Sequence, residues 1–245
     1  MTNIADRLVP RTARRSVMRW WRALMQRPRV GAIDFGDLRS LRPISTWGFD
    51  RGTPIDRYYI DQFLSSEAGA VRGRVLEVGN DDLTRRYGGE RVTRSDVLHV
   101  ADSAPPVTIV GDLVAGAGLS PAAFDCAIIT QTIQFIYDVD AVVRTLHRIL
   151  APGGFALVTM PGITCISRHD MDRWGQFWCF TTRSARQLFE EAFAPENVDV
   201  TAYGNVLAAI AFLHGIASEE LNGDELAKHD PDFQTLIAVR ARKEA

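Results

Sequence analysis

The sequence predicts an α/β fold with a doubly wound, mostly parallel sheet of about seven strands and helices on both faces. Two observations support this prediction. From residue 74 onward, short apolar segments alternate with helical or loop segments, which is typical of repeated β-α-β units. A segment with a 3.6-residue period over 139–150 also stops at Ala-Pro-Gly-Gly, where proline and glycine forbid continuation of a helix. A length of 245 residues suits one such domain with additions at its ends.

The apolar segments define the expected strands, and the periodic segments define the expected helices. Strands are expected at 74–78, 91–96, 107–110, 125–129 and 155–160, and then, after a polar and aromatic loop, at 197–203 and 234–240. Helices are expected over 139–150, over 184–193 and over about 205–218. No internal repeat or low-complexity tract interrupts this order, so a single sheet is predicted.

The first thirty residues differ in charge from the rest of the chain. They hold eight arginines against Asp6 alone, a net charge of +7, whereas the remaining residues carry −9. Residues 12–26 place apolar side chains on one face of a helix and arginines over much of the rest, which predicts a basic amphipathic helix. Such a helix packs on its own domain or lies on an anionic membrane, and the first is commoner. We therefore expect an N-terminal helix in 1–30, a lead-in or lid in 31–70 and the main domain in 71–245.

Composition and charge argue against several classes of protein. An acidic body is unsuited to nucleic acid, whose binding needs a basic patch. The longest apolar run, 206–217, is interrupted by His214 and is far shorter than the ~20 residues of a membrane span. The basic N-terminus lacks the apolar region of a signal peptide. Three widely spaced cysteines predict free thiols in a reducing cytoplasm and no metal site.

Candidate ligand-binding residues gather at the expected carboxyl ends of the first four strands, where an open parallel sheet binds its ligand. Asp96 lies nineteen residues after Glu77, close to the ~20-residue interval at which an acidic side chain reaches the hydroxyls of a bound ribose. These positions together predict a nucleoside site. The candidates are Glu77, Gly79 and Asn80 at the first strand, Asp96 and Val97 at the second, Asp112 and Leu113 at the third, and Thr130 and Gln131 at the fourth.

Two longer motifs resemble a known family. Residues 124–138, FDCAIITQTIQFIYD, and residues 146–161, LHRILAPGGFALVTMP, resemble the second half of class I S-adenosylmethionine-dependent methyltransferases of the type-11 small-molecule group. The L-x-R-x-L-x-P-G-G element is the strongest part of a resemblance that spans about residues 70–204. It implies a Rossmann-like sheet whose last strand is antiparallel, and S-adenosyl-L-methionine as the cofactor. It further implies Glu77 and Gly79 at the methionine end, Asp96 at the ribose, Asp112 and Leu113 at the adenine, and the Thr130–Gln131 backbone beside the sulfonium.

The turn after the first strand departs from the family pattern E-x-G-x-G-x-G. Here Glu77 and Gly79 are followed by Asn-Asp-Asp-Leu, so only the first glycine is present. S-adenosyl-L-methionine has no pyrophosphate, and close approach of the backbone is therefore less necessary than in a dinucleotide site. Asn and Asp tolerate the left-handed conformation better than other non-glycine residues, so residues 80–82 are expected to make the glycine turn. The absence of a G-x-G-x-x-G motif argues against a NAD enzyme.

Methyl transfer is an in-line displacement at a carbon activated by positive sulfur, so alignment supplies most of the catalysis. A general base is needed only if the acceptor is a hydroxyl or a protonated amine. The candidates for that base are His169 and Asp170, after the fifth strand, although a solvated histidine is an equally good interpretation of His169. Candidates for acceptor binding, with core packing or surface ion pairs as the alternative, are Arg51, Tyr58, Tyr59, Trp174 and Trp178.

These inferences favour O-methylation of a small molecule or sugar-containing metabolite in a biosynthetic pathway of secondary metabolism. The expected partner is a small-molecule acceptor and not a nucleic acid. A first alternative is a non-catalytic relative whose altered turn binds the cofactor poorly and which serves as a binding partner. A second is a membrane-associated enzyme of glycan or lipid-linked sugar modification that uses the arginine-rich helix. The oligomeric state stays open.

Overall fold

The computed structural model describes residue 28, residues 32–101 and residues 106–244. The chain divides into two compact units, Met1–Arg42 and Pro43–Ala245. In the first unit the described residues hold a 3₁₀ turn, η2 (Gly36–Leu38). The basic helix expected over 12–26 lies outside the described residues. All other described elements belong to the second unit.

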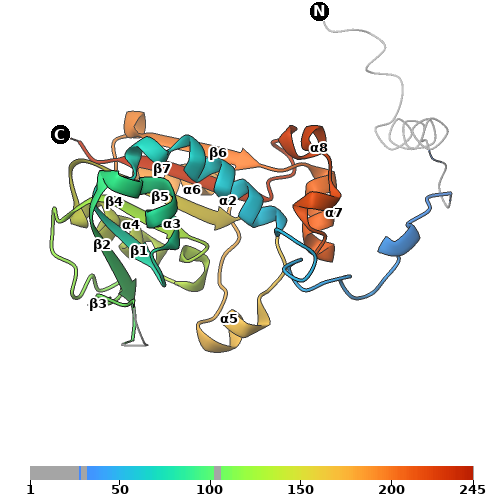
Figure 1. Cartoon of the computed structure of the whole chain (residues 1–245), viewed down its shortest axis with the longest axis horizontal. Helices are drawn as coiled ribbons and strands as arrows, with labels where there is room; N and C mark the ends of the chain where they lie inside the picture. The colour runs from blue at the N-terminus through green and yellow to red at the C-terminus, as the bar shows by residue number, and fades with distance from the viewer. Residues whose placement is uncertain (1–27, 29–31, 102–105, 245) are drawn as a thin grey trace, which may run out of the picture. The chain divides into compact units, whose positions relative to one another are not determined.

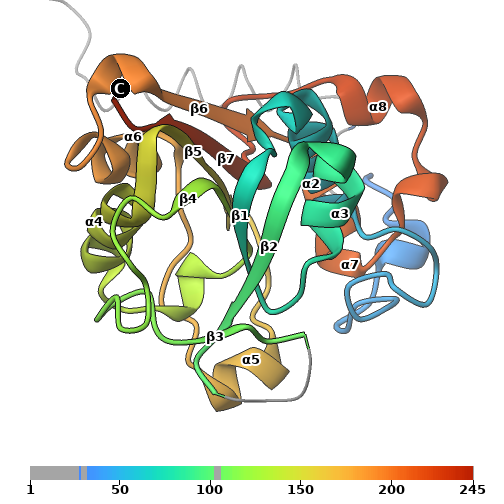
Figure 2. The same cartoon turned by 60° about the vertical axis from the view of Figure 1, so that its left-hand side comes forward.

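Within the described residues of the second unit, seven strands form one sheet in the order β3-β2-β1-β4-β5-β7-β6. Strands β1 to β5 are parallel, whereas β7 runs antiparallel to both of its neighbours, β5 and β6 (Figure 2). The predicted doubly wound sheet with an antiparallel last strand is confirmed. The strands are β1 (Gly73–Val78), β2 (Val92–His99), β3 (Ile109–Val110), β4 (Phe124–Thr130), β5 (Leu150–Pro161), β6 (Val198–Tyr203) and β7 (Leu236–Arg242).

Helices cover both faces of this sheet. One face carries α2 (Ile55–Ser66), α3 (Asp82–Gly88) and α7 (Val206–His214), and the other carries α4 (Val139–Ile149) and α6 (Thr182–Glu190) (Figures 1 and 2). A short helix, α5 (Arg168–Arg173), lies beyond the carboxyl ends of the parallel strands (Figure 2), and α8 (Gly223–Ala227) precedes β7.

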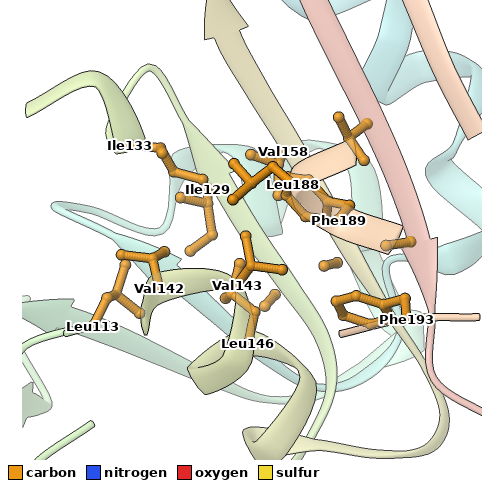
Figure 3. Close-up of a cluster of buried hydrophobic side chains, with 14 of the residues drawn as sticks. Leu113, Ile129, Ile133, Val142, Val143, Leu146, Val158, Leu188, Phe189 and Phe193 are labelled. Atoms are coloured by element: carbon orange, nitrogen blue, oxygen red, sulfur yellow. The ribbon is translucent and has the colours of Figure 1, made fainter. Parts of the chain in front are cut away.

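The two cores follow from the alternation of side chains along a buried strand. In β4, Ile129 belongs to the cluster under α4 and α6, whereas its neighbour Ile128 belongs to the cluster under α2 and α7. Figure 3 shows Val142, Val143 and Leu146 of α4 in the first cluster with Ile129. Both faces of the central strands are therefore buried. A ligand can reach polar groups of these strands at the strand ends.

Local sequence explains where the helices begin and end. Asp138 caps α4 by accepting a hydrogen bond from the Ala141 N–H at 3.0 Å, and the helix ends at Ile149, before Pro152, as predicted. Helix α7 ends at His214, earlier than expected, because Gly215 takes a left-handed conformation with φ of +66°. Residues 168–173, expected as loop, form α5 instead.

The second strand is longer than the sequence indicated. It was expected to end at Asp96, but β2 continues to His99, because Val97 and Leu98 pair with the end of β1 and His99 pairs with Val110 of β3. Both Val97 and Leu98 are buried. The carboxyl end of β2 therefore lies three residues beyond the expected position, which moves Asp96 into the middle of the strand.

Candidate active site

The turn between β1 and α3 is organised by Gly79 and Glu77. Gly79 has a φ of +88°, and apart from its chain neighbours no atom lies within 4 Å of the position that a Cβ would take. The Glu77 carboxylate accepts hydrogen bonds from the N–H groups of Leu83, at 3.3 Å, and Thr84, at 2.7 Å, and from the Thr84 hydroxyl at 2.8 Å. Glu77 thus caps the first turn of α3, and Gly79 leaves open space beside it.

Residues 80–82 do not adopt the left-handed conformation that the sequence led us to expect. Among the described residues, a positive φ outside glycine occurs only at Trp47, Ala122 and Gln131. The Asn80 side-chain amide instead donates to the Asp82 carboxylate at 2.9 Å. One left-handed residue is sufficient, because α3 begins at Asp82, directly after the turn.

Burial has the largest effect on the pKa of the Glu77 carboxyl, because this residue is only 2% exposed. Burial raises the pKa of this carboxyl above its ordinary value, and the hydrogen bonds from Thr84 and Leu83 offset part of that rise. The carboxylate is therefore buried and accepts three hydrogen bonds from the chain itself, so it does not face open solvent.

Asp96 is buried in the sheet and paired with two arginines. Its carboxylate lies 2.6 Å from Nε of Arg74 and 3.0 Å from Nη2 of Arg94, and it accepts a hydrogen bond from the Thr108 hydroxyl at 3.2 Å. Burial acts to raise the pKa of Asp96, but the hydrogen bonds and charges of both arginines outweigh it, and the pKa is lowered. Because β2 continues past it, Asp96 does not reach the edge where the pockets lie.

A pocket of about 330 Å³ opens at the carboxyl ends of β1, β2, β3 and β4, and we call it the strand-end pocket. Of the residues predicted to bind a cofactor, Gly79, Asp112, Leu113 and Gln131 line it. Glu77, Asn80, Asp96, Val97 and Thr130 are not part of its wall. The lining is completed by Val78, Leu98, His99, Val100, Gly111, Val114, Thr132, Phe135, Ile136, Asp170 and Trp174.

A second pocket of about 260 Å³ lies beside the first, and we call it the helix pocket because α2, α5 and α7 contribute to it. Burial raises the pKa of Asp56 in this wall, against the lowering effect of the neighbouring Arg57. The Arg57 guanidinium lies 4.0 Å from the Asp56 carboxylate. The pocket is lined by Trp47, Phe49, Asp56, Arg57, Gln131, Gln134, Phe135, Pro161, Thr164, Ser167, His169, Asp170, Gln176, Phe212 and Thr235.

The two pockets share the side chains of Gln131, Phe135 and Asp170. Gln131 has a φ of +46°, an uncommon conformation for a residue with a side chain, and its N–H donates to the Thr159 carbonyl at 3.0 Å. Backbone strain of this kind concentrates at functional sites. Gln131, Phe135 and Asp170 thus form the boundary between the two pockets.

Helix α5 carries both predicted catalytic residues. One carboxylate oxygen of Asp170 accepts a hydrogen bond from the Ser167 hydroxyl at 2.6 Å, and the side chain faces both pockets. His169 is exposed, its Nε2 contacts the Arg173 guanidinium, and it lines only the helix pocket. The Phe177 N–H donates to the Gln134 carbonyl at 2.8 Å, which ties the end of this segment to the pocket wall.

The residues predicted to bind the acceptor lie outside the helix pocket. Tyr59 is fully buried, and its hydroxyl donates to the Leu226 carbonyl at 3.1 Å, so it is a core residue. Arg51 pairs with Glu220. The remaining three are Tyr58, which lines a separate hollow beside α3, Trp174, which lines the strand-end pocket, and Trp178, whose indole N–H donates to the Ile136 carbonyl at 3.1 Å.

Several wall residues were missed by sequence reasoning. Gln134 lies three residues after Gln131 and is the one polar residue in 133–136, a signal that could have found it. His99 would have followed from a correct end of β2. Trp47 carries no readable signal, because its segment holds no sheet motif and the fold brings it to the pocket. Thr235 belongs to the strand expected over 234–240, but nothing in the sequence marks it as part of a pocket wall.

A family model described as a methyltransferase domain matches residues 28–193, which is more than half of the chain. The chain belongs to this methyltransferase-domain family. The prediction of a class I S-adenosylmethionine-dependent methyltransferase, with S-adenosyl-L-methionine as cofactor, is thereby confirmed at the level of family and fold. No curated protein sequence matches the chain.

Solved structures with the same fold include proteins with different reactions. The N-methyltransferase NodS from Bradyrhizobium japonicum, in complex with S-adenosyl-L-homocysteine, is 16% identical over 85% of this chain and 95% of its own, with a TM-score of 0.52. The [4+2]-cyclase SpnF is 14% identical over 84% and 89%, with a TM-score of 0.51. A putative sarcosine dimethylglycine methyltransferase from Galdieria sulphuraria is 14% identical over 77% and 86%, with a TM-score of 0.50. At this identity the likeness concerns the fold, and the reaction of this methyltransferase has to be argued from its site.

Two further properties of the described part of the methyltransferase bear on its partners. None of its helices within residues 32–101 and 106–244 is both long and apolar enough to cross a membrane. In the same ranges, no three His, Cys, Asp or Glu side chains gather in a way that could hold a metal ion.

Proposed function

We propose that this methyltransferase transfers a methyl group from S-adenosyl-L-methionine to a hydroxyl group of a small molecule bound in the helix pocket. The observation that supports the proposal is the pair of adjoining pockets with Gln131, Phe135 and Asp170 as their common wall. Transfer between two bound molecules needs two sites that meet where the bond is exchanged.

The residues of the strand-end pocket suit the cofactor. Its volume of about 330 Å³ is that of a small-molecule site, and apolar side chains such as Leu98 and Leu113 offer faces to a base. Oδ1 of Asp112 is engaged by the N–H groups of its own turn, which leaves its second oxygen for an exocyclic amine. We assign the adenine to Asp112 and Leu113 and the methionine end to the open space at Gly79. Asp96 was expected at the carboxyl end of β2, but His99 occupies that position and lines the strand-end pocket.

The chain's own part in the reaction is to hold the acceptor, exclude water and remove a proton. S-adenosyl-L-methionine, when bound, supplies a methyl group on positively charged sulfur. A neutral hydroxyl must lose its proton as it becomes an ether oxygen, and Asp170 is placed to accept that proton at the carboxylate oxygen that Ser167 leaves free. His169 is the weaker candidate, because its Nε2 already contacts Arg173.

Titration calorimetry with S-adenosyl-L-methionine and S-adenosyl-L-homocysteine tests cofactor binding. We expect heat from both compounds, and the absence of heat and of a thermal shift at millimolar concentration would contradict the proposal. Transfer from cofactor carrying a ¹³C-labelled methyl group then reports the bond formed, because methyl carbons on oxygen, nitrogen and carbon resonate apart in NMR spectra. A labelled methyl on nitrogen or carbon would reject O-methylation while leaving the enzyme in place.

A second candidate function is a methyltransferase-fold protein that binds without transferring a methyl group. The turn after β1 favours it, because the buried Glu77 carboxylate accepts three hydrogen bonds that cap α3 and residues 80–82 lack the family glycines. Weak or absent calorimetric binding of the cofactor, together with no labelled product from any acceptor, would support this alternative.

We further propose that the enzyme works in the cytoplasm, in a biosynthetic pathway. The three cysteines, Cys126, Cys165 and Cys179, are free thiols, which supports a reducing cytoplasm. The modest size of the helix pocket supports an acceptor of metabolite size in a biosynthetic pathway of secondary metabolism.

A further inference from the structure

Arg57, in the first turn of α2, is the one arginine or lysine that the described residues place in the wall of the helix pocket. Its side chain is 45% exposed, so a ligand can reach it from solvent. The same side chain also lines the separate hollow beside α3, which has a volume of about 500 Å³. Arg57 therefore lies at the border of two open spaces and is accessible to a bound molecule.

The guanidinium of Arg57 makes no hydrogen bond to an acceptor among the described residues. Its Nε lies 4.0 Å from one carboxylate oxygen of Asp56, which is beyond hydrogen-bond distance. The other oxygen of Asp56 accepts the backbone N–H of Arg57 at 2.8 Å. The five N–H donors of the guanidinium are therefore left unused by the described part of the chain.

The two carboxylates in the wall of the hollow beside α3 have other partners. Oδ1 of Asp61 lies 2.6 Å from Nη2 of Arg86. The Glu219 carboxylate accepts hydrogen bonds from the Thr53 N–H at 2.9 Å and from the Thr53 hydroxyl at 2.7 Å. Apart from the contact with Asp56 at 4.0 Å, the positive charge of Arg57 therefore has no partner among the described residues.

The chemistry of this wall favours a ligand with one negative charge. The planar guanidinium donates parallel hydrogen bonds to both oxygens of a carboxylate at once. Asp56 and Asp170 stand in the same wall, and together they repel a ligand with two negative charges more strongly than a ligand with one. Burial raises the pKa of Asp56, which disfavours the ionised form that would compete for Arg57. A carboxylate therefore fits this wall better than a phosphate dianion.

Aromatic side chains form much of the remaining wall. Trp47 packs on Phe212 with ring centroids 5.6 Å apart, and Phe135 belongs to the boundary with the strand-end pocket. Trp47 is held at a φ of +68°, a conformation that is rare for a bulky residue and is retained where surrounding structure enforces it. Flat apolar faces in a pocket of about 260 Å³ suit a small ring. The pocket thus combines an apolar surface with one basic group that a ligand can reach.

From these contacts we infer that Arg57 selects the methyl acceptor by binding a carboxylate that the acceptor carries in addition to the hydroxyl to be methylated. The acceptor is then a small hydroxy acid with an apolar ring, and not a neutral alcohol. The inference rests on the proposed function, because it takes the helix pocket to be the acceptor site. The carboxylate of the cofactor is not the expected partner, since Gly79, at the methionine end, lines the strand-end pocket and Arg57 does not.

Ligand-observed saturation-transfer NMR on the full chain, with S-adenosyl-L-homocysteine present, tests the inference without requiring turnover. The probes are 4-hydroxybenzoate and its neutral counterpart 4-hydroxybenzamide, which share the ring and the hydroxyl. We expect the carboxylate to bind roughly tenfold more tightly, because it accepts charge-assisted hydrogen bonds from Arg57. A third probe, phenyl phosphate, should bind more weakly than 4-hydroxybenzoate. Equal binding of the first two probes, no binding by either, or tighter binding of the phosphate overturns the inference.

Two variants of Arg57 and a matched control assign the preference to this residue. Arg57→Met removes the charge and keeps an unbranched side chain, so the preference for the carboxylate should fall to about twofold or less. Arg57→Lys keeps the charge without the planar fork and should retain part of the preference. Arg144→Met removes an exposed arginine of α4 that lines neither pocket, so the preference should be unchanged. A full preference in Arg57→Met, a preference no larger in Arg57→Lys than in Arg57→Met, or its loss in Arg144→Met overturns the inference.

Thermal unfolding and cofactor calorimetry on the same samples separate the inference from the proposed function. The unfolding midpoint of Arg57→Met should stay within about 2 °C, and its affinity for S-adenosyl-L-homocysteine within about threefold, because the side chain bonds neither the chain nor the cofactor. A drop of several degrees would reveal a structural role, and a loss of affinity of about tenfold would assign Arg57 to the cofactor carboxylate; either result overturns the inference. Cofactor binding with no preference for 4-hydroxybenzoate rejects the inference alone, whereas the preference without cofactor binding rejects the proposed function alone.

Discussion

Thr84 donates two hydrogen bonds to the carboxylate of Glu77, from its N–H at 2.7 Å and from its hydroxyl at 2.8 Å. Both residues are buried. The contact joins the end of β1 to the first turn of α3 across the turn that lacks the family glycines. The turn is therefore held by a side-chain cap in addition to the left-handed conformation of Gly79.

Thr84→Val should lower the free energy of unfolding by about 1.5–3 kcal/mol, because the buried Glu77 carboxylate loses a charge-assisted hydrogen bond while the shape of the side chain is kept. Urea denaturation followed by circular dichroism measures the change. Thr93→Val on the exposed face of β2 is the control and should stay within about 0.5 kcal/mol. Equal losses of unfolding free energy in the two variants would show that the hydrogen bond to Glu77 contributes no more to stability than an exposed threonine does.

Asp96→Asn should destabilise the fold by roughly 2–3 kcal/mol at neutral pH, because the buried carboxylate pairs with Arg74 and Arg94. The pKa of Asp96 is lowered in the fold, so its carboxylate contributes stability above the ordinary pKa of an aspartate and loses it as pH falls through the lowered value. The difference between the two proteins should accordingly be full at pH 7 and should shrink in acid, starting near pH 4.

Unfolding curves from pH 7 to pH 3 measure this difference, with Asp199→Asn as the control. Asp199 pairs with Arg240 at 3.1 Å but is 69% exposed, so its loss should cost no more than about 1 kcal/mol. Because Asp96 lies outside the strand-end pocket, Asp96→Asn should also leave cofactor affinity within about threefold. A large loss of cofactor affinity without a loss of stability would instead show that Asp96 binds the ribose, as the sequence indicated.

Features that depend on the local sequence could be predicted, whereas features that depend on contacts between distant segments could not. The sheet, α4 and its stop at Pro152 could be predicted, because alternation and helix-breaking residues act locally. The end of β2 could not, because the pairing of Val97 and Leu98 with β1 decides it. The helix pocket could not be predicted either, since Trp47 and Thr235 meet there from opposite ends of the second unit.

Gly79→Ala should weaken cofactor binding, because Gly79 has a φ of +88° and faces the open strand-end pocket. A side chain there strains the backbone by about 1–3 kcal/mol and also narrows the space beside the turn. Gly89→Ala is the matched control, since Gly89 has a φ of +53°, equally open surroundings and no place in the pocket wall. Both variants should lose stability, and only Gly79→Ala should lose affinity in calorimetry. Parallel losses of affinity would mean that the pocket is not the cofactor site.

The assignment of the general base to Asp170 rests on its position, and a set of three variants separates it from its neighbours on α5. Asp170 faces both pockets, whereas Asp172 is exposed and pairs with Arg168 at 3.2 Å, and His169 contacts Arg173. Asp170→Asn keeps the size of the side chain but removes the proton acceptor, so kcat should fall by roughly 10²–10⁴ while cofactor affinity stays nearly constant. Asp172→Asn should retain the activity of the unsubstituted enzyme.

His169→Gln decides between the two residues that the sequence singled out. If Asp170 removes the proton, His169→Gln should retain kcat within about threefold, because the contact with Arg173 leaves Nε2 no role in proton transfer. Rates of S-adenosyl-L-homocysteine release across pH give the deciding measurement. A kcat that falls in His169→Gln and survives in Asp170→Asn would assign the proton to the histidine. That outcome would require α5 to rearrange once the acceptor binds, because only then could Nε2 leave the arginine and face the shared wall.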